Sequence, residues 1–302
     1  MPTSKQYDVI IVGGSYSGLA AAMALGRAMR KVLVIDSGKP CNIQTPHSHN
    51  FLTQDGKTPL EIATLAKQQL AVYNTVEFVN GTVTGGNKAD DGFVVKTLEG
   101  EAFTGSKLVF ATGVKDELPA IKGFAECWGI SVIHCPYCHG YEVRNAPTAI
   151  LANGVPGFEL AKLIANWTAD LRLFTNSASA LTAWEAARLA EHGIKIIEKE
   201  VQELEHTRGK LRNVVFKDGS NMEVNVIYSR PSFTQHCTLP AQLGCELTEE
   251  GYIRVDVSQQ TSIRGVYACG DNTSRMRTVA NAVASGTTTG IMVNKELIEE
   301  RF

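Results

Sequence analysis

Residues 7–36 read YDVIIVGGSYSGLAAAMALGRAMRKVLVID. Tyr7–Val12 is a short, β-branched apolar run, which is typical of a buried strand. Leu19–Met29 is rich in Ala and Leu and favours a helix, and Lys31–Ile35 is a second apolar run that ends at Asp36. The order of strand, glycine-rich turn, helix and strand predicts a βαβ unit with a parallel strand pair, and therefore an α/β fold.

The turn between the first strand and the helix has the residues that a dinucleotide site needs. Gly13, Gly14 and Gly18 allow the backbone to approach a pyrophosphate, whose charge is favoured at a helix N-terminus. Ser15 stands where the strict G-x-G-x-x-G pattern has its second glycine. Asp36 lies 18 residues after Gly18, a sequence separation that suits a carboxylate hydrogen-bonded to a ribose hydroxyl. We predict a dinucleotide loop, with a purely structural glycine turn as the alternative.

The rest of the chain shows a second unit of the same kind. A helix is expected over Pro59–Val72 and an antiparallel meander over Val76–Val109. Strand, turn, helix and strand recur over Thr148–Thr175, and Asp218-Gly219 is a candidate hairpin turn. A long final helix is expected from about Thr278 to Glu299. The 302-residue length favours roughly two domains.

Composition narrows the class of protein. With 29 Lys plus Arg against 31 Asp plus Glu, the net charge of -2 argues against nucleic acid or an anionic membrane as the main partner. No apolar run approaches the roughly 20 residues of a membrane span, and no signal-peptide pattern is visible, so a cytoplasmic location is expected. Seven cysteines suit a reducing compartment better than a disulfide framework.

The segment CPYCHG begins with Cys135 and holds a second cysteine, Cys138, three residues later. Such a pair can close a small disulfide ring, and a helix that begins at the second cysteine would lower its thiol pKa. His139 is placed to move a proton during thiol–disulfide exchange. The alternatives are a zinc site, which lacks a second close pair, and inert reduced thiols. We expect a redox disulfide and no metal site.

The remaining cysteines and several histidines have weaker signals. None of the other five cysteines has a partner at a diagnostic spacing, so each is interpreted as a small core residue. They are Cys41, Cys127, Cys237, Cys245 and Cys269. His47, His49 and His236 lie in polar segments, where a surface or structural histidine is more common than a functional one.

Four motifs occur in one order along the chain: the first glycine loop, ATG at 111–113, the cysteine pair, and ACGD at 268–271 before the final helix. In these motifs the chain resembles the low-molecular-weight thioredoxin reductases over essentially its whole length. The resemblance implies two Rossmann-like, three-layer nucleotide-binding domains. An FAD domain would be discontinuous, with residues 1–115 and 243–302, and residues 116–242 would form a middle domain that carries the cysteine pair.

The resemblance also assigns roles to individual residues. Cys138 would exchange electrons with the flavin, Cys135 would form the mixed disulfide with the substrate, and His139 would replace the family's usual acid. The residues expected to bind FAD are Gly13, Gly14, Ser15, Gly18, Asp36, Ser37, Asn50, Val83, Thr112, Gly113, Gly270, Asp271, Arg277, Thr278 and Val279.

The CPxCHG sequence resembles a branch that includes fungal dithiol oxidases such as gliotoxin oxidase. In the second nucleotide unit, the turn at 152–157 lacks the first two glycines of NADPH-binding relatives, and no arginine for a 2′-phosphate or carboxylate for a ribose follows the strand at 171–175. NADP(H) is therefore a doubtful cofactor.

We expect an FAD-dependent thiol–disulfide oxidoreductase acting on a thioredoxin-like protein or a small dithiol or disulfide. Ferredoxin or another flavoprotein is a candidate electron donor, and family members are commonly homodimers. The alternatives are an NADPH-dependent thioredoxin reductase, a dithiol oxidase that uses oxygen, and a non-catalytic module that binds FAD or zinc.

Overall fold

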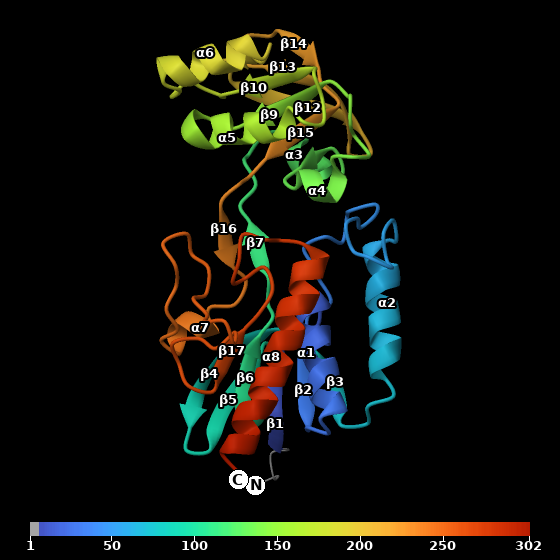
Figure 1. The fold of residues 1–302 in the computed structure, drawn as a ribbon, viewed down its shortest axis with the longest axis vertical. Coiled ribbons are helices and arrows are strands. Elements are labelled where there is room, and N and C mark those ends of the chain that lie inside the picture. The colour runs from blue at the N-terminus through green and yellow to red at the C-terminus, as the bar shows by residue number, and fades with distance from the viewer. Residues whose placement is uncertain (1–5) are drawn as a thin grey trace. The chain divides into compact units, whose positions relative to one another are not determined.

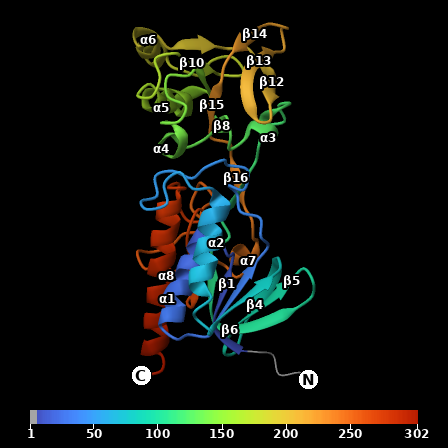
Figure 2. The ribbon, with the colours of Figure 1, turned by 90° about the vertical axis from the view of Figure 1, so that its right-hand side faces the viewer.

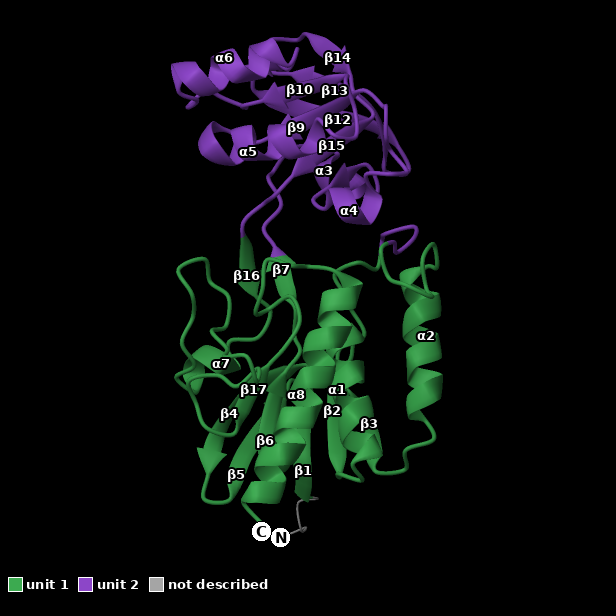
Figure 3. Ribbon diagram, viewed as in Figure 1, with its two compact units in different colours: residues 1–43, 50–115, 233–302 green, residues 44–49, 116–232 purple. Residues whose placement is uncertain are grey.

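The computed structural model describes residues 6–302, which divide into two compact units (Figure 3). Unit 1 holds the described residues up to Ile43, together with Asn50–Lys115 and Phe233–Phe302. Unit 2 holds Gln44–His49 and Asp116–Ser232. The units are defined by contacts alone, so the assignment of 1–115 with 243–302 to FAD and of 116–242 to the cysteine pair stays a prediction.

Unit 1 is built on a seven-stranded sheet with the order β3-β2-β1-β6-β5-β4, in which β17 also pairs with β6 (Figure 1). Its strands are β1 (Gln6–Val12), β2 (Val32–Asp36), β3 (Val76–Asn80), β4 (Val83–Ala89), β5 (Gly92–Thr97), β6 (Ala102–Phe110) and β17 (Val266–Ala268). The strands β1, β2, β3, β6 and β17 are parallel to their neighbours within this group. Their carboxyl ends therefore lie at one edge, where nucleotides bind in such sheets.

The antiparallel meander expected over Val76–Val109 is wrong for its first strand. β3 pairs in parallel with β2, in a register that places Val76 opposite Val32. The helix between these two strands makes the crossover that a parallel pair needs. Within residues 76–110, the antiparallel pairs are β4 with β5 and β5 with β6. Alternation of apolar residues indicates a strand but does not identify its partner.

The helices of unit 1 are α1 (Tyr16–Arg27), α2 (Pro59–Leu70), α7 (Leu239–Gln242) and α8 (Val279–Glu299). Thr58 starts α2 with a capping box, in which its side chain accepts from the Glu61 amide. α1 and α8 lie side by side on one face of the sheet (Figures 1 and 2). They can approach closely because Gly286 has no side chain. A Cβ at this position would lie only 2.1 Å from the Ser17 carbonyl oxygen.

Unit 2 contains a parallel five-stranded sheet, β11-β10-β9-β15-β8, and an antiparallel three-stranded sheet, β12-β13-β14. The strands are β8 (Val132–Ile133), β9 (Thr148–Leu151), β10 (Leu171–Phe174), β11 (Lys195–Ile197), β12 (Val201–Thr207), β13 (Lys210–Phe216), β14 (Asn221–Glu223) and β15 (Val226–Ser229). The helices are α3 (Phe124–Cys127), α4 (Pro136–His139), α5 (Gly154–Ile164) and α6 (Ala183–Glu191). The segment 116–232 of this unit is connected to unit 1 through a two-stranded sheet, β7 (Val114–Asp116) with β16 (Phe233–Gln235).

Two cores give unit 2 its three layers. One core joins the two sheets and includes the edge-to-face ring pair Phe174 and Phe216. The other packs residues of α5 and α6, such as Phe158 and Leu189, against the opposite face of the parallel sheet. The hairpin expected at Asp218-Gly219 is confirmed, since β13 and β14 pair antiparallel around it.

Candidate functional site

The glycine loop of unit 1 is held against the end of β6. Gly13 has φ +103°, and a Cβ there would lie 2.2 Å from the Ala111 carbonyl oxygen. A Cβ at Gly18 would lie 1.9 Å from the Gly13 carbonyl oxygen. Ser15 is the N-cap of α1, its side chain makes no capping hydrogen bond, and the first turn contains no acidic residue. The helix thus begins with amide groups that no side chain caps and no carboxylate neutralises, as an anion site requires.

Asp36 ends β2 beside this loop. The Gly14 amide donates a hydrogen bond of 3.0 Å to Asp36 Oδ1, which orients the carboxylate. A Cβ at Gly14 would lie 2.9 Å from the Asp36 Cβ, so the loop and the acid are in close contact. Ser37, the next residue, is exposed. Val83 begins β4 and is buried in the core that also contains Val12.

The ATG and ACGD segments meet at the same edge of the sheet. A Cβ at Gly270 would lie 2.6 Å from Ser17 Oγ in the first turn of α1. Asn272, which is fully buried, donates from Nδ2 to the Phe110 carbonyl oxygen at 2.9 Å and to Thr112 Oγ1 at 3.3 Å. No side chain stands within 4 Å of the position of a Cβ at Gly113. Asn272 is not among the residues predicted from the sequence, although it directly follows the ACGD motif.

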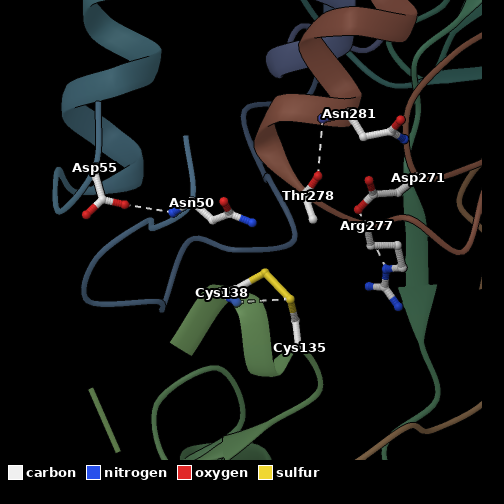
Figure 4. The surroundings of a disulfide bond; sticks show 8 residues. All are labelled: Asn50, Asp55, Cys135, Cys138, Asp271, Arg277, Thr278 and Asn281. Carbon is white, nitrogen blue, oxygen red and sulfur yellow. Dashed lines mark hydrogen bonds and ion pairs between the residues drawn. A yellow bond between two sulfur atoms is a disulfide. The ribbon is translucent and has the colours of Figure 1, made fainter. Parts of the chain in front are cut away.

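The start of α8 adds three further predicted residues to unit 1. Asp271 and Arg277 form an ion pair, with 3.6 Å between Oδ2 and Nε. Thr278 is the N-cap of α8, accepts a hydrogen bond of 3.2 Å from the Asn281 amide (Figure 4), and precedes Val279, the first helical residue.

Asn50 is also in unit 1 and has φ +59°. The backbone N–H of Asn50 donates to Asp55 Oδ1 at 2.7 Å. This hydrogen bond fixes the start of the loop that leads to α2.

The residues at this edge match what FAD requires. The glycine loop leaves no room for side chains where a pyrophosphate would need close backbone contact. Asp36 supplies a carboxylate with more acceptor sites than the single Gly14 amide uses. Asn272 Oδ1 is buried and has no hydrogen-bond partner among the described residues, which is unusual for a buried amide.

Cys135 and Cys138 of unit 2 form a disulfide with a Cα–Cα distance of 5.3 Å (Figure 4). Cys135 is the N-cap of α4, and the Cys138 amide donates to Cys135 Sγ at 3.2 Å. The helix does not begin at the second cysteine, which was the condition under which its dipole would lower the thiol pKa, because Cys138 lies inside α4. α4 is a single turn that begins at Pro136, because proline at the first helical position loses no hydrogen bond there.

The other cysteines separate into two groups. Cys127, Cys237, Cys245 and Cys269 are buried, as expected for small core residues. Burial raises the pKa of Cys269 to about 11, so this thiol stays protonated at neutral pH. Cys41 is exposed, and its interpretation as a core residue is wrong.

Comparison with known proteins identifies the family. A profile described as pyridine nucleotide-disulphide oxidoreductase matches residues 7–286. The chain belongs to this family. The thioredoxin reductase tcpT of Claviceps purpurea is 32% identical over 99% of this chain and 97% of its own length. An oxidoreductase structure from Agrobacterium tumefaciens aligns with a TM-score of 0.92 at 35% identity, covering 98% of this chain and 99% of that one. The putative thioredoxin reductase TrxB of Bacillus anthracis has a TM-score of 0.93 at 29% identity, covering 98% and 100%.

Membership bears out the resemblance found in the sequence. This pyridine nucleotide-disulphide oxidoreductase is an FAD-dependent enzyme of the thioredoxin reductase type, and it has the two-domain α/β fold of that type. Among residues 6–302, no helix combines the length and apolar character needed to cross a bilayer.

Within this family member, the second nucleotide unit has an unusual turn after β9. Asn153 caps α5, accepts from the Gly154 and Ala180 amides at 2.8 Å each, and donates to the Ala178 carbonyl oxygen at 2.9 Å. One side chain therefore ties the turn after β9 to the loop after β10, at the sheet edge where a dinucleotide would bind. Glu198, which follows β11, accepts from the Ser179 amide in the same loop at 2.9 Å. Sequence reasoning found no carboxylate for this loop because Glu198 comes from the next strand.

The histidine after the cysteine pair is half-buried in unit 2. Burial is the main cause that lowers the pKa of His139, the charge of His49 lowers it further, and the carboxylate of Glu142 opposes both. His49 Nε2 lies 3.6 Å from Glu142 Oε1, within ion-pair distance. Because its pKa is lowered, His139 is neutral at pH 7 and able to accept a proton.

Proposed function

We propose that Cys135 and Cys138 are the redox-active pair of this enzyme, and that they pass two electrons between FAD and the dithiol or disulfide of a substrate. The observation that carries this proposal is the disulfide itself, which closes on a one-turn helix and is followed directly by His139. Following the family, Cys135 would bond to the substrate sulfur and Cys138 would react with the flavin.

The glycine loop, Asp36 and the ATG and ACGD segments of unit 1 would hold FAD. When bound, FAD supplies an acceptor and donor of two electrons. The Ser15–Gly18 end of α1 would face its phosphates and Asp36 a ribose hydroxyl. This proposal makes residues 1–115 and 243–302 the FAD domain and residues 116–242 the domain of the cysteine pair.

We further propose that NADPH is not the main electron donor. The amide of Asn153 bridges the two turns that would have to contact the pyrophosphate. Glu198 presents a carboxylate at the loop where a 2′-phosphate would need cations. A charged hydrogen bond contributes about 1.5–3 kcal/mol, so replacing cations by an acid removes a large part of NADPH affinity.

A thioredoxin-like protein or a small dithiol is the substrate class that these observations support, since the relatives above are named thioredoxin reductases. Ferredoxin or another flavoprotein would then supply electrons. A homodimer in the cytoplasm is part of the proposal by analogy with the family.

Anaerobic titration of the purified, FAD-loaded protein tests the donor. Flavin absorbance is followed during addition of NADPH, NADH, reduced ferredoxin or dithiothreitol. We expect dithiothreitol to bleach the flavin and micromolar NADPH to leave it oxidised. Rapid bleaching by micromolar NADPH would overturn the donor proposal.

Single variants test the cysteine pair. Cys135→Ser and Cys138→Ser should each reduce flavin bleaching by dithiothreitol to background, because either one removes the disulfide. Cys41→Ser is the control, since that exposed residue is no part of the pair and should leave the rate unchanged. Full dithiol reactivity in both pair variants would contradict the proposed role.

A second candidate is a dithiol oxidase with oxygen as the electron acceptor. The bridged turn at Asn153 favours it, because an enzyme without a nicotinamide donor can run from dithiol to flavin to oxygen. Oxygen uptake upon addition of a dithiol is the test. Absence of uptake, together with rapid reduction by ferredoxin, would exclude the oxidase and support the reductase direction.

A further inference from the structure

Unit 2 brings three ionisable side chains together beside the cysteine pair. His139 ends α4, and Glu142 follows it by three residues in the turn after that helix, a spacing that places both on one side of a helical turn. His49 reaches the same place from the loop 44–49, and its Nε2 lies 3.6 Å from Glu142 Oε1.

The loop that carries His49 belongs to unit 2 through its packing. A Cβ at Gly129 would lie 3.1 Å from Thr45 Oγ1, and Gly129 has φ +77°. The His47 and His49 rings are tilted against each other with centroids 6.3 Å apart. The loop 44–49 therefore packs against unit 2, where His49 lies next to Glu142.

A buried phenol of the same unit is acted on by the charge of Glu142. Tyr228 is 1% exposed, pairs in register with Ile133 two residues before Cys135, and has no hydrogen-bond partner for its hydroxyl among the described residues. Burial and the Glu142 charge both raise its pKa, so the phenol stays neutral. The charged groups that act on His139 are therefore His49 and Glu142.

The three groups differ in access to water in a way that suits proton movement. His139 is half-buried, the His49 side chain is 18% exposed and the Glu142 side chain is 40% exposed. A proton taken up by His139 can leave toward solvent through Glu142, whose side chain is more exposed than that of His49. The family's usual acid after the cysteine pair is absent, so the carboxylate of this site stands at Glu142 instead.

We propose that His49 and Glu142 are positioning residues that set the protonation of His139, which takes the substrate proton during exchange at the cysteine pair. This inference rests on the proposed function of Cys135 and Cys138. Neither histidine needs to contact the flavin for it to hold.

The cluster serves the exchange of a substrate dithiol with the Cys135–Cys138 disulfide. A substrate thiol gives its proton to His139, and its sulfur bonds to Cys135 Sγ while the bond to Cys138 breaks and Cys138 leaves as a thiolate. The second substrate thiol, deprotonated to solvent, then displaces Cys135. The substrate ends as a disulfide, the protein pair holds the two electrons, and the proton on His139 passes to water through the cluster.

Neutral His139 is the form that accepts the proton, so the exchange rate falls as pH drops below its pKa. His49→Gln removes a neighbouring positive charge that lowers the pKa of His139, so it should move this acid limb to higher pH. Glu142→Gln is made in the His49→Gln background, because alone it would also remove the partner of His49. The double variant should move the limb back to lower pH.

Two measurements on the FAD-loaded protein test the proposal. Alkylation quench and mass spectrometry follow reduction of the Cys135–Cys138 disulfide by dithiothreitol between pH 4.5 and 8. NMR titration of the His139 imidazole reports its protonation directly, without any turnover. His192→Gln and Glu191→Gln, at the end of α6 in the same unit, are the matched controls and should shift neither readout.

The proposal is supported if both readouts move to higher pH in His49→Gln than in the wild type, and to lower pH in the double variant than in His49→Gln. An unchanged His139 titration in His49→Gln, or a double variant that titrates no lower than His49→Gln, would overturn it. If wild-type protein exchanges no disulfide with dithiothreitol, the proposed function fails, and the NMR titration still decides whether His49 and Glu142 control His139.

Discussion

At the scale of single residues, the proposed cofactor edge of unit 1 depends on contacts between backbone and side chain. The Gly14 amide and the Asp36 carboxylate orient each other across the first turn. Gly13 and Gly18 are required because a Cβ at either would collide with a carbonyl oxygen, that of Ala111 directly after β6 or that of Gly13 directly after β1. The features that sequence motifs identify best are of this local kind.

Replacing the acid at the end of β2 should weaken FAD binding. Asp36→Asn keeps an oxygen for the Gly14 amide but removes the charge that strengthens a hydrogen bond to a ribose hydroxyl. We expect a loss of about 1–2 kcal/mol, or roughly 5- to 30-fold in Kd. Flavin fluorescence during reconstitution of the apoprotein measures it. Asp91→Asn, in the exposed β4–β5 turn, is the control; equal affinity in both variants would rule out a role for Asp36.

Residues at the sites were predictable from the sequence to different degrees. The glycine loop, Asp36 and the cysteine pair belong to short patterns whose chemistry requires those residues. Asn272, Glu198 and the partnership of His49 with Glu142 join segments that lie far apart in the chain, and no local pattern encodes those contacts.

At the scale of elements, the close packing of α1 and α8 aligns the first turn of α1 with the ACGD segment. Gly286 and Gly290 stand four residues apart on α8, and a Cβ at either would lie within 2.6 Å of a carbonyl oxygen of α1. Helix lengths were predicted well because propensity and capping are local. The parallel pairing of β3 was not, since strand partners depend on long-range packing.

A methyl group between these helices should destabilise unit 1. Gly286→Ala places a Cβ 2.1 Å from the Ser17 carbonyl oxygen, so the helices must separate. We expect the free energy of unfolding to fall by about 1–3 kcal/mol, measured by urea denaturation. Gly85→Ala in β4 is the matched control, because nothing lies within 4 Å of its Cβ position. Equal stability of the two variants would show that the helices can adapt.

The other end of α8 is anchored by a nearly buried ion pair. Lys107 Nζ lies 3.1 Å from Glu296 Oε1 and 2.7 Å from Glu300 Oε1, and the Tyr267 hydroxyl donates to Glu296 at 2.6 Å. Burial acts to raise the pKa of Glu296, but the Tyr267 hydrogen bond and Lys107 outweigh it and hold the pKa below its usual 4.5.

Because this pKa is lowered in the folded state, Glu296 stabilises the fold above pH 4.5 and loses that effect as pH falls below it. Glu296→Gln should therefore reduce unfolding free energy by about 1–3 kcal/mol at pH 7 and by less at pH 3.5. Urea denaturation at the two pH values measures the difference. A constant effect of Glu296→Gln at both pH values would count against this ion pair.

At the scale of the whole molecule, each unit has hydrophobic cores of its own. Unit 1 carries the proposed FAD residues and unit 2 the cysteine pair. The two-domain α/β class followed from two βαβ patterns and the chain length. The membership of residues 44–49 in unit 2 did not, because a short loop carries no periodicity that shows where it packs.

Removing FAD should act on one unit selectively. A ligand present at 100 times its Kd stabilises its binding unit by about 2.7 kcal/mol. Scanning calorimetry of the holoprotein and apoprotein should therefore show two transitions, of which FAD raises only one. Hydrogen exchange assigns this transition to a unit. If it belongs to unit 1, the backbone amides of unit 1 should lose their protection from exchange before those of unit 2 when FAD is removed. Equal shifts of both transitions would show that the units unfold together.

The loop 44–49 has a practical consequence for dissecting this protein. A fragment cut at residues 116 and 232 would retain the Cys135–Cys138 ring, the bridged turn and Glu142, yet it would lack the imidazole that pairs with that carboxylate. Such a fragment would titrate differently from the intact chain, and its thiol chemistry would describe an altered protein.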